Sequence, residues 1–129
     1  MKTKVVSVLL SLFLLSSCEE LIPDHAYFIK IQNNSTDTIK YYESYLYPDT
    51  SIAKAKPRLV TVYPSDFDFL ESRKKWKDVL KSDTLMIFIL SKDTVQRNSW
   101  ESIKNGYKVL KRYDLSVKDI DKNNIVVYP

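Results

Sequence analysis

The sequence predicts a mainly β domain, arranged as an antiparallel sheet or a two-sheet sandwich with two or three short helices. Apolar and polar residues alternate directly after Ala26, as in a strand with one buried face. Six consecutive apolar residues, Leu85 to Leu90, are typical of a central strand covered on both faces. Strands and helices do not alternate regularly as they do in parallel folds. An α+β arrangement is the alternative.

The domain is expected to begin with a β-hairpin. Residues 27–32 alternate as a first strand, and 33–37 (Asn-Asn-Ser-Thr-Asp) form a cluster of turn residues. Alternation resumes over 39–45 and predicts the second strand. A third strand is expected from Arg58 to Tyr63, ended by Pro64.

The segment from Phe67 to Leu80 is predicted to be a helix. Phe69, Trp76 and Leu80 fall on one face at helical spacing. We interpret the basic run as the solvated back of this helix, with contact to anionic headgroups or an acidic glycan as the functional alternative. The run consists of Arg73, Lys74, Lys75, Lys77 and Lys81.

A second helix is expected where Asn98 and Glu101 have the spacing of a capping box, and Gly106 is placed to end it. Residues 107–113 alternate and predict a strand. Helical spacing from Trp100 to Leu110 leaves one longer helix as the alternative.

The chain is predicted to close with a helical turn at residues 116–119 and a strand at 125–128. We divide it into a signal peptide over 1–17, a lipidated cysteine and short tether over 18–25, and a single β-rich domain over 26–129. A domain of this length has room for one hydrophobic core.

The N-terminus has the order of a secretory signal: Lys2 and Lys4, an apolar run over 5–15, then Leu15-Ser16-Ser17-Cys18. At ~1.5 Å per residue the run covers about 16 Å, whereas spanning a bilayer takes roughly 20 residues. A cleaved signal peptide therefore fits better than a transmembrane helix. An ordinary cleaved signal or an uncleaved anchor is the alternative.

The Leu15-Ser16-Ser17-Cys18 box resembles the lipobox of bacterial lipoproteins. That resemblance implies that Cys18 becomes the new N-terminus, carries acyl chains, and anchors the protein to the lipid bilayer of the outer membrane. Several short sequence segments are also similar to those of small uncharacterised lipoproteins of Bacteroides-type bacteria, for which no activity is known. They lie at residues 83–89, 100–103, 110–116 and 125–129.

The same resemblance implies two further features. Glu19-Glu20 follows Cys18 where acidic residues act as a surface-export signal in such bacteria. Those bacteria also attach O-glycans at Asp-Thr or Asp-Ser before a small or aliphatic residue. An Asp that closes a turn before a Thr that opens a strand is the alternative reading. The matching threonines are Thr38, Thr84 and Thr94.

Composition argues against several classes of function. Cleavage of the predicted signal peptide removes Lys2 and Lys4. The Lys and Arg count then falls from 20 to 18 against 16 acids, and the net charge falls from +4 to +2. We therefore expect no nucleic-acid partner. Cys18 is the only cysteine, so no disulfide can form within the chain. One glycine excludes the common phosphate-binding loops.

Catalytic residue types are scarce. His25 is the only histidine, and we expect it at the surface or a strand edge. Asp66 and Asp68 lie two apart, a spacing open to Ca²⁺ binding or glycoside hydrolysis, yet Asp66 also suits a helix start. We expect no metal, no cofactor and no enzyme activity, with a carboxylate hydrolase as the least favoured reading.

Aromatic residues are the remaining surplus. Tyr41 and Tyr45 share one strand face, and with Trp100 they are candidates for stacking on sugar rings. Packing in the core is the favoured alternative. The sequence thus predicts a membrane-anchored extracytoplasmic lipoprotein, a non-enzymatic interaction or envelope module with an envelope protein or glycan as its partner. A glycan-binding accessory lipoprotein is the alternative.

Overall fold

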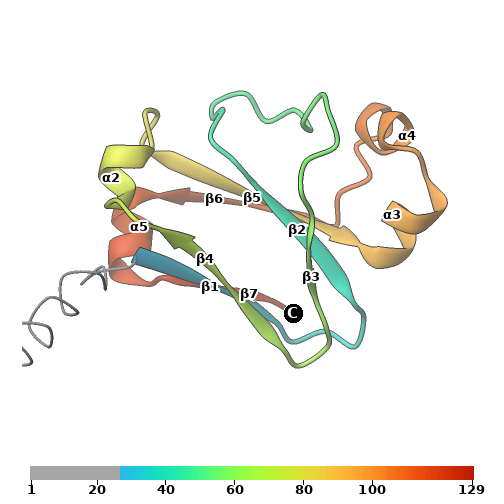
Figure 1. Cartoon of the computed structure of the whole chain (residues 1–129), viewed down its shortest axis with the longest axis horizontal. Helices are drawn as coiled ribbons and strands as arrows, with labels where there is room; N and C mark the ends of the chain where they lie inside the picture. Colours follow the sequence, from blue (N-terminus) through green and yellow to red (C-terminus); the bar gives the residue numbers. More distant parts are fainter. Residues whose placement is uncertain (1–26) are drawn as a thin grey trace, which may run out of the picture.

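The computed structural model describes residues 27–129, so the predicted signal peptide, Cys18, Glu19-Glu20 and His25 lie outside the described residues. The described part holds seven strands in two sheets and four short helices, with 39% strand against 21% helix (Figure 1). This confirms the mainly β class. One helix more is present than the two or three expected.

The two sheets lie one above the other. The strand order of the three-stranded sheet is β4 (Phe67–Ser72), β1 (Tyr27–Asn33), β7 (Ile125–Tyr128). The central strand β1 is antiparallel to β4 and parallel to β7. The four-stranded sheet is antiparallel throughout. Its order is β3 (Val60–Val62), β2 (Ile39–Ser44), β5 (Thr84–Ser91), β6 (Lys111–Ser116).

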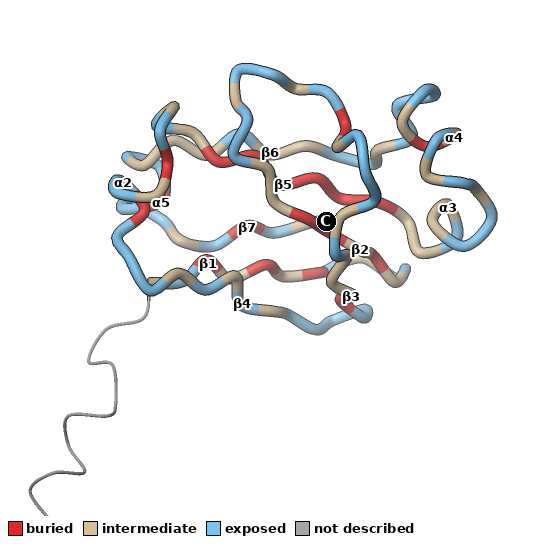
Figure 2. The backbone as a smooth tube through the Cα atoms, turned by 45° about the horizontal axis from the view of Figure 1, so that its top comes forward, coloured by how far each residue is buried: buried red, intermediate tan, exposed pale blue. Residues whose placement is uncertain are grey.

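Strand β5 is buried on both faces, as its unbroken apolar sequence predicts (Figure 2). Its odd-numbered side chains enter the core between the two sheets, and its even-numbered ones enter a second core on the other face. The first core is completed by residues such as Ile29, Ile31 and Val126. The second is completed by Tyr42, Ile52 and Ile103.

The helices lie at the two ends of the molecule. At one end α3 (Lys92–Arg97) and α4 (Trp100–Asn105) follow β5, and α4 contributes Ile103 to the second core. At the other end α2 (Trp76–Val79) and α5 (Val117–Lys122) lie beside the start of β1. The described chain therefore enters its first strand next to α2 and α5.

The predicted hairpin of the first two strands is wrong, because β1 and β2 belong to different sheets. Asn33, which is fully buried, turns the chain from one sheet to the other. Its Nδ2 donates to the carbonyl oxygens of Asp37 (2.7 Å) and Val62 (3.1 Å), and its Oδ1 accepts from the backbone N–H of Ser35 (3.0 Å). The turn residues thus form a corner between sheets.

The predicted helix from Phe67 to Leu80 is also wrong. Residues 67–72 form β4, and only Trp76–Val79 is helical. Leu70 lies opposite Ile29 of β1 and packs on the core, whereas Phe69 faces outward. Pairing with β1 outweighs the helical spacing because it buries Leu70 and satisfies the backbone hydrogen bonds. The basic run therefore starts in a turn and continues through α2.

The cap of α4 is shifted by one residue from the prediction. Ser99 is the N-cap, and its Oγ accepts from the Ser102 N–H at 3.1 Å. Asn98 instead ends α3, and Glu101 forms an ion pair with Lys104 at 3.0 Å. The helix ends at Gly106 as predicted.

The strand expected over 107–113 begins only at Lys111, after a turn that contains Tyr107 at a φ of 46°. Both the longer helix and the earlier strand start are thus wrong. The helical turn after Ser116 is confirmed, with a complete capping box between Ser116 and Asp119. The final strand is confirmed too, and it pairs in parallel with β1.

Replacing Ser116 by Ala is expected to lower the free energy of unfolding by about 1 kcal/mol, because the Asp119 N–H loses its cap acceptor. Urea unfolding followed by circular dichroism measures the loss. Thr36→Ala, in an exposed turn, is the control and should change stability by less than about 0.5 kcal/mol. Equal losses in the two variants would contradict the role of the cap.

Candidate functional site

The three aromatic residues predicted to stack on sugars do not share a surface. Tyr41 is 1% exposed and lies in the core between the sheets. Trp100 is half-buried against the second core, and its Nε1 donates to the Ala53 carbonyl at 2.7 Å. Only Tyr45 is exposed, at 43%. Packing accounts for Tyr41 and Trp100, so the structure does not assemble this stacking site.

Two of the three threonines predicted to carry O-glycans come together. The Lys92 N–H donates to the Thr38 carbonyl (3.2 Å), which brings Thr38 beside the start of α3, where Thr94 lies. A cleft of about 280 Å³ there is lined by Asp37, Thr38 and Asp93 among others. Thr84 begins β5 at its opposite end. All three threonines are half-buried.

Asp68, singled out as a candidate carboxylate, joins the two sheets. The Tyr41 hydroxyl donates to Asp68 Oδ2 at 2.6 Å. Burial, and then the neighbouring Asp68, raise the pKa of Tyr41 well above its ordinary value, so this hydroxyl remains a donor. Glu43 and Arg58 line the same cleft of about 300 Å³. The described contact of Asp68 is thus a structural one that closes the sandwich.

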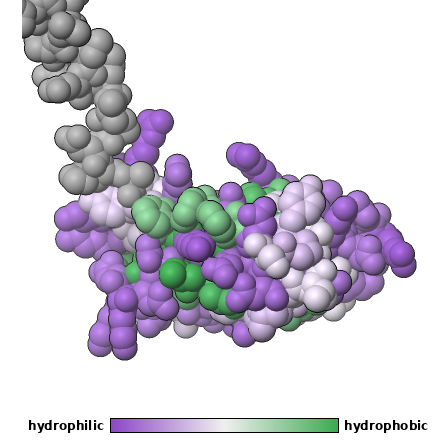
Figure 3. Space-filling model, turned by 90° about the horizontal axis from the view of Figure 1, so that it is seen from below, coloured by the Kyte–Doolittle hydropathy of each residue, from purple (hydrophilic) through white to green (hydrophobic). Residues whose placement is uncertain are grey.

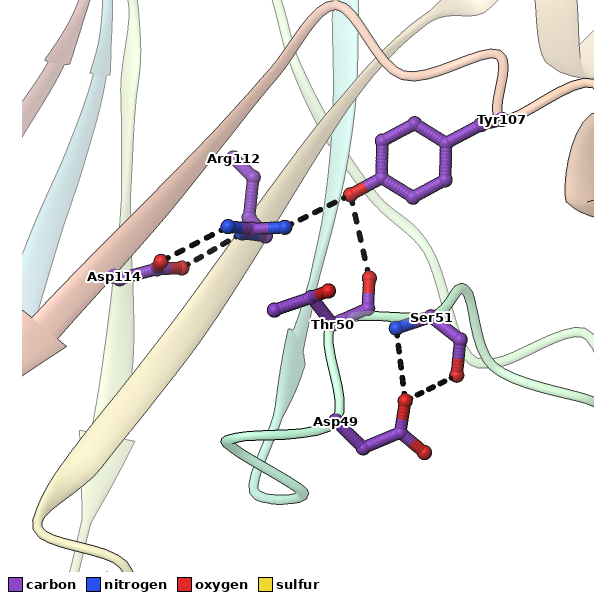
Figure 4. A network of polar contacts seen from close by, with 6 residues as sticks. All are labelled: Asp49, Thr50, Ser51, Tyr107, Arg112 and Asp114. Atoms are coloured by element: carbon purple, nitrogen blue, oxygen red, sulfur yellow. Dashed lines mark hydrogen bonds and ion pairs between the residues drawn. The ribbon is translucent and has the colours of Figure 1, made fainter.

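A second polar cluster fastens the loop after β2 to β6 (Figure 4). Arg112 Nε and Nη2 donate to the two carboxylate oxygens of Asp114 at 2.8 and 3.1 Å. Arg112 Nη1 donates to the Tyr107 hydroxyl, which donates in turn to the Thr50 carbonyl at 3.3 Å. Because these groups satisfy one another's hydrogen bonds, we interpret the cluster as structural: it holds the loop after β2 against β6.

The most distinctive surface is the outer face of the three-stranded sheet. Five apolar side chains point away from the core there, each 42–48% exposed. Figure 3 shows an apolar area on this side of the molecule, bordered by hydrophilic side chains. We call this surface the apolar outer face. It consists of Phe28 on β1, Phe67 and Phe69 on β4, and Ile125 and Val127 on β7.

Three polar residues, Lys30, Gln32 and Glu71, share the register of this face. Lys30 lies at its centre, with its Nζ 4.4 Å from the centroid of the Phe67 ring. Phe69 meets Phe28 edge to face, with centroids 5.1 Å apart and planes at 74°. Phe69 meets Phe67 similarly, at 5.2 Å and 64°. The rings therefore do not form the coplanar platform that stacks on sugar rings.

Sequence reasoning missed this face. It placed Phe69 on one face of a helix with Trp76 and Leu80, and it described residues 27–32 only as an alternating strand. Two signals pointed to it: Phe28 is apolar at a position where alternation calls for a polar residue, and Ile125-Val126-Val127 is apolar without interruption. Both patterns are typical of strands that present apolar side chains on two faces.

Exposed cations gather at the end of this sheet where β1 begins. Ser72, the last residue of β4, pairs with Tyr27, and the exposed Arg73, Lys74, Lys75 and Lys77 follow directly. Two clefts of about 340 and 300 Å³ adjoin Tyr27 and the buried Trp76. Trp76 Nε1 has no acceptor among the described residues. Cations outnumber the acids Asp78, Asp119 and Asp121 at this end, which is hollowed around Trp76.

Comparison with known protein families, curated proteins and solved structures finds no significant match to this chain. Within residues 27–129 no group of three or more His, Cys, Asp or Glu side chains is placed to hold a metal ion. No helix of that same part is long and apolar enough to cross a membrane.

Proposed function

We propose that the chain is a lipid-anchored extracytoplasmic protein that acts as a non-enzymatic interaction or envelope module. The observation that carries this proposal is the apolar outer face. Apolar side chains gathered on one sheet face and bordered by polar residues favour a contact surface over apolar side chains scattered singly. The two polar clusters built around Tyr41 and Arg112 are occupied by partners within the chain.

The N-terminal sequence supports the anchor. A basic start, a short apolar run and the Leu15-Ser16-Ser17-Cys18 box together favour an acylated Cys18, through which the protein would be held at the outer membrane. Stable anchoring takes two lipid signals, because one acyl chain binds only marginally. The several chains of a bacterial lipoprotein meet this requirement. The anchor places the domain beside a membrane, where an apolar face finds envelope partners.

Replacing Cys18 by Ala is expected to abolish acylation, because the acyl-bearing thiol is lost. Intact-mass spectrometry should find peptide plus acyl chains in the parent protein and peptide alone in the variant. In detergent-phase partitioning, a variant whose signal is cleaved should be found in the aqueous phase. A variant that is not processed should instead keep the mass of the uncleaved signal. Ser17→Ala keeps a small residue before Cys18 and is the matched control. Membrane retention and processing of Cys18→Ala like the parent would contradict the anchor.

A further inference from the structure

We propose that the apolar outer face rests on the lipid bilayer to which Cys18 is attached. This inference rests on the proposed anchor and deepens it, since it names the partner of the exposed face. The bilayer would then be bound twice, through the acyl chains and through the side of the three-stranded sheet.

The length of the tether limits how far this face can lie from the lipid. Nine peptide units join Cys18 to Tyr27, and at 3.3–3.6 Å each they span at most about 30 Å. Strand β1, with 7 residues, is roughly 23 Å long at 3.3 Å per residue. The reach of the tether is thus similar to the length of the face. A surface held this close meets the bilayer at a high effective concentration.

The chemistry of the face suits the boundary between headgroups and acyl chains. Phenylalanine and aliphatic side chains gain by leaving water there. Lys30 is compatible with this position, because its apolar stem lies on the face while its ammonium can reach headgroup phosphates. Glu71 is the one acid among the outward residues of the three strands, and it lies next to the basic run.

Charge favours the same orientation. The exposed cations Arg73, Lys74, Lys75 and Lys77 lie at the end of the sheet where the tether joins β1. Cations held close to a membrane are attracted by anionic headgroups, and salt weakens this attraction. The tether and the cations therefore lie at the same end of the three-stranded sheet, next to the apolar outer face.

Two other occupants fit the face less well. The phenylalanine rings meet at 74° and 64°, so they offer no single flat aromatic surface to a chain of sugar rings. A stable dimer buries about 800 Å² on each partner. The flat footprint of three strands about 4.8 Å apart and some 20 Å long is roughly 300 Å², which is small for a stable dimer even though accessible surface exceeds footprint. A small area is sufficient for a bilayer contact, because the acyl chains already hold the protein there.

The test uses the full-length acylated protein in vesicles of phosphatidylcholine with phosphatidylglycerol. Acylation occupies Cys18, so Val127→Cys supplies a unique thiol for a polarity-sensitive fluorophore; the Val127 side chain is exposed. Leu46→Cys, in the loop after β2 and 65% exposed, is the matched control. At position 127 we expect blue-shifted emission, severalfold protection from aqueous iodide and quenching by nitroxide-labelled lipids. At position 46 the probe should behave as in water.

A second pair of variants tests the apolar side chains. Phe69→Glu in the Val127→Cys protein should reduce lipid quenching severalfold, because a carboxylate resists entry into the headgroup region. Tyr63→Glu, also at an exposed aromatic outside the face, should leave the quenching unchanged.

Each contrary outcome identifies what fails. Equal iodide access at positions 127 and 46 on vesicle-bound protein overturns the bilayer contact and leaves the anchor standing. Protection from iodide without quenching by lipid nitroxides means that a second copy or another molecule covers the face, which also overturns the inference. Protein that carries no acyl chains and does not bind vesicles overturns the anchor and this inference together.

Discussion

Replacing Phe88 by Ala is expected to lower the free energy of unfolding by about 3–5 kcal/mol. Phe88 is fully buried at the middle of β5 and lies directly opposite Tyr42 of β2. The two rings stack with centroids 4.8 Å apart and planes within 2° of parallel. Truncation removes the stack and opens a cavity enclosed by the residues of the second core. Domains are stable by only about 5–15 kcal/mol, so this loss is a large fraction of the total.

Urea unfolding followed by far-ultraviolet circular dichroism measures this loss, and Phe67→Ala is the matched control. It makes the same truncation at a side chain that is nearly half exposed. Its cost should be clearly smaller, about 1–2 kcal/mol, because roughly half of this side chain already stays in water in the folded state. Similar losses at positions 88 and 67 would show that the second core does not enclose β5 as described.

Replacing Asn33 by Asp is expected to cost about 2–4 kcal/mol, because two donated hydrogen bonds are lost in a buried site. The Asn33 Nδ2 group serves the carbonyls of Asp37 and Val62, and a carboxylate oxygen there faces both with no proton to donate. Burial beside carbonyl oxygens should raise the pKa of the new carboxyl in the folded state. The deficit relative to the parent should therefore shrink as the pH falls and the carboxyl takes up a proton.

Urea unfolding at several pH values tests this prediction, with Asn34→Asp as the control. Asn34 is exposed, and its Oδ1 accepts from Gln32 Nε2 at 2.7 Å, a role that a carboxylate keeps. Its substitution should change stability by less than about 0.5 kcal/mol. A loss at Asn34→Asp as large as that at Asn33→Asp would contradict the corner assigned to Asn33.

Strands were predictable where burial on one or both faces imposes a pattern on the chain. Alternation located β1 and β2, and the unbroken run over 85–90 located β5 and its two cores. The same pattern does not say which strand is the neighbour. The corner at Asn33 depends on contacts with Val62, 29 residues away, and no local propensity encodes that contact.

The segment 67–80 shows how tertiary pairing overrides spacing. Phe69, Trp76 and Leu80 satisfy a helical period, whereas a strand over 67–72 is only weakly indicated because Phe69 and Leu70 are adjacent apolar residues. Only the open edge of β1 decides between them, because β4 gains a full ladder of backbone hydrogen bonds there. This choice turns Phe67 and Phe69 outward and creates much of the apolar outer face. The sequence signals at Phe28 and Ile125-Val126-Val127 therefore indicate apolar outward side chains, but not the neighbouring phenylalanines that complete the candidate surface.

Local sequence patterns were sufficient to predict the mainly β class, the doubly buried strand β5 and the capped turn after Ser116, because each depends on neighbouring residues. The N-terminal pattern around Cys18 likewise predicts an anchor from local order alone. Tertiary structure alone decided the pairing of β1 with β4 and β7, which brings residues 28, 67–69 and 125–127 onto one face. The outer face of a sheet combines segments that are distant in the sequence. Their register is set by the side chains that the opposite, inner face buries in the core, and no local pattern specifies it.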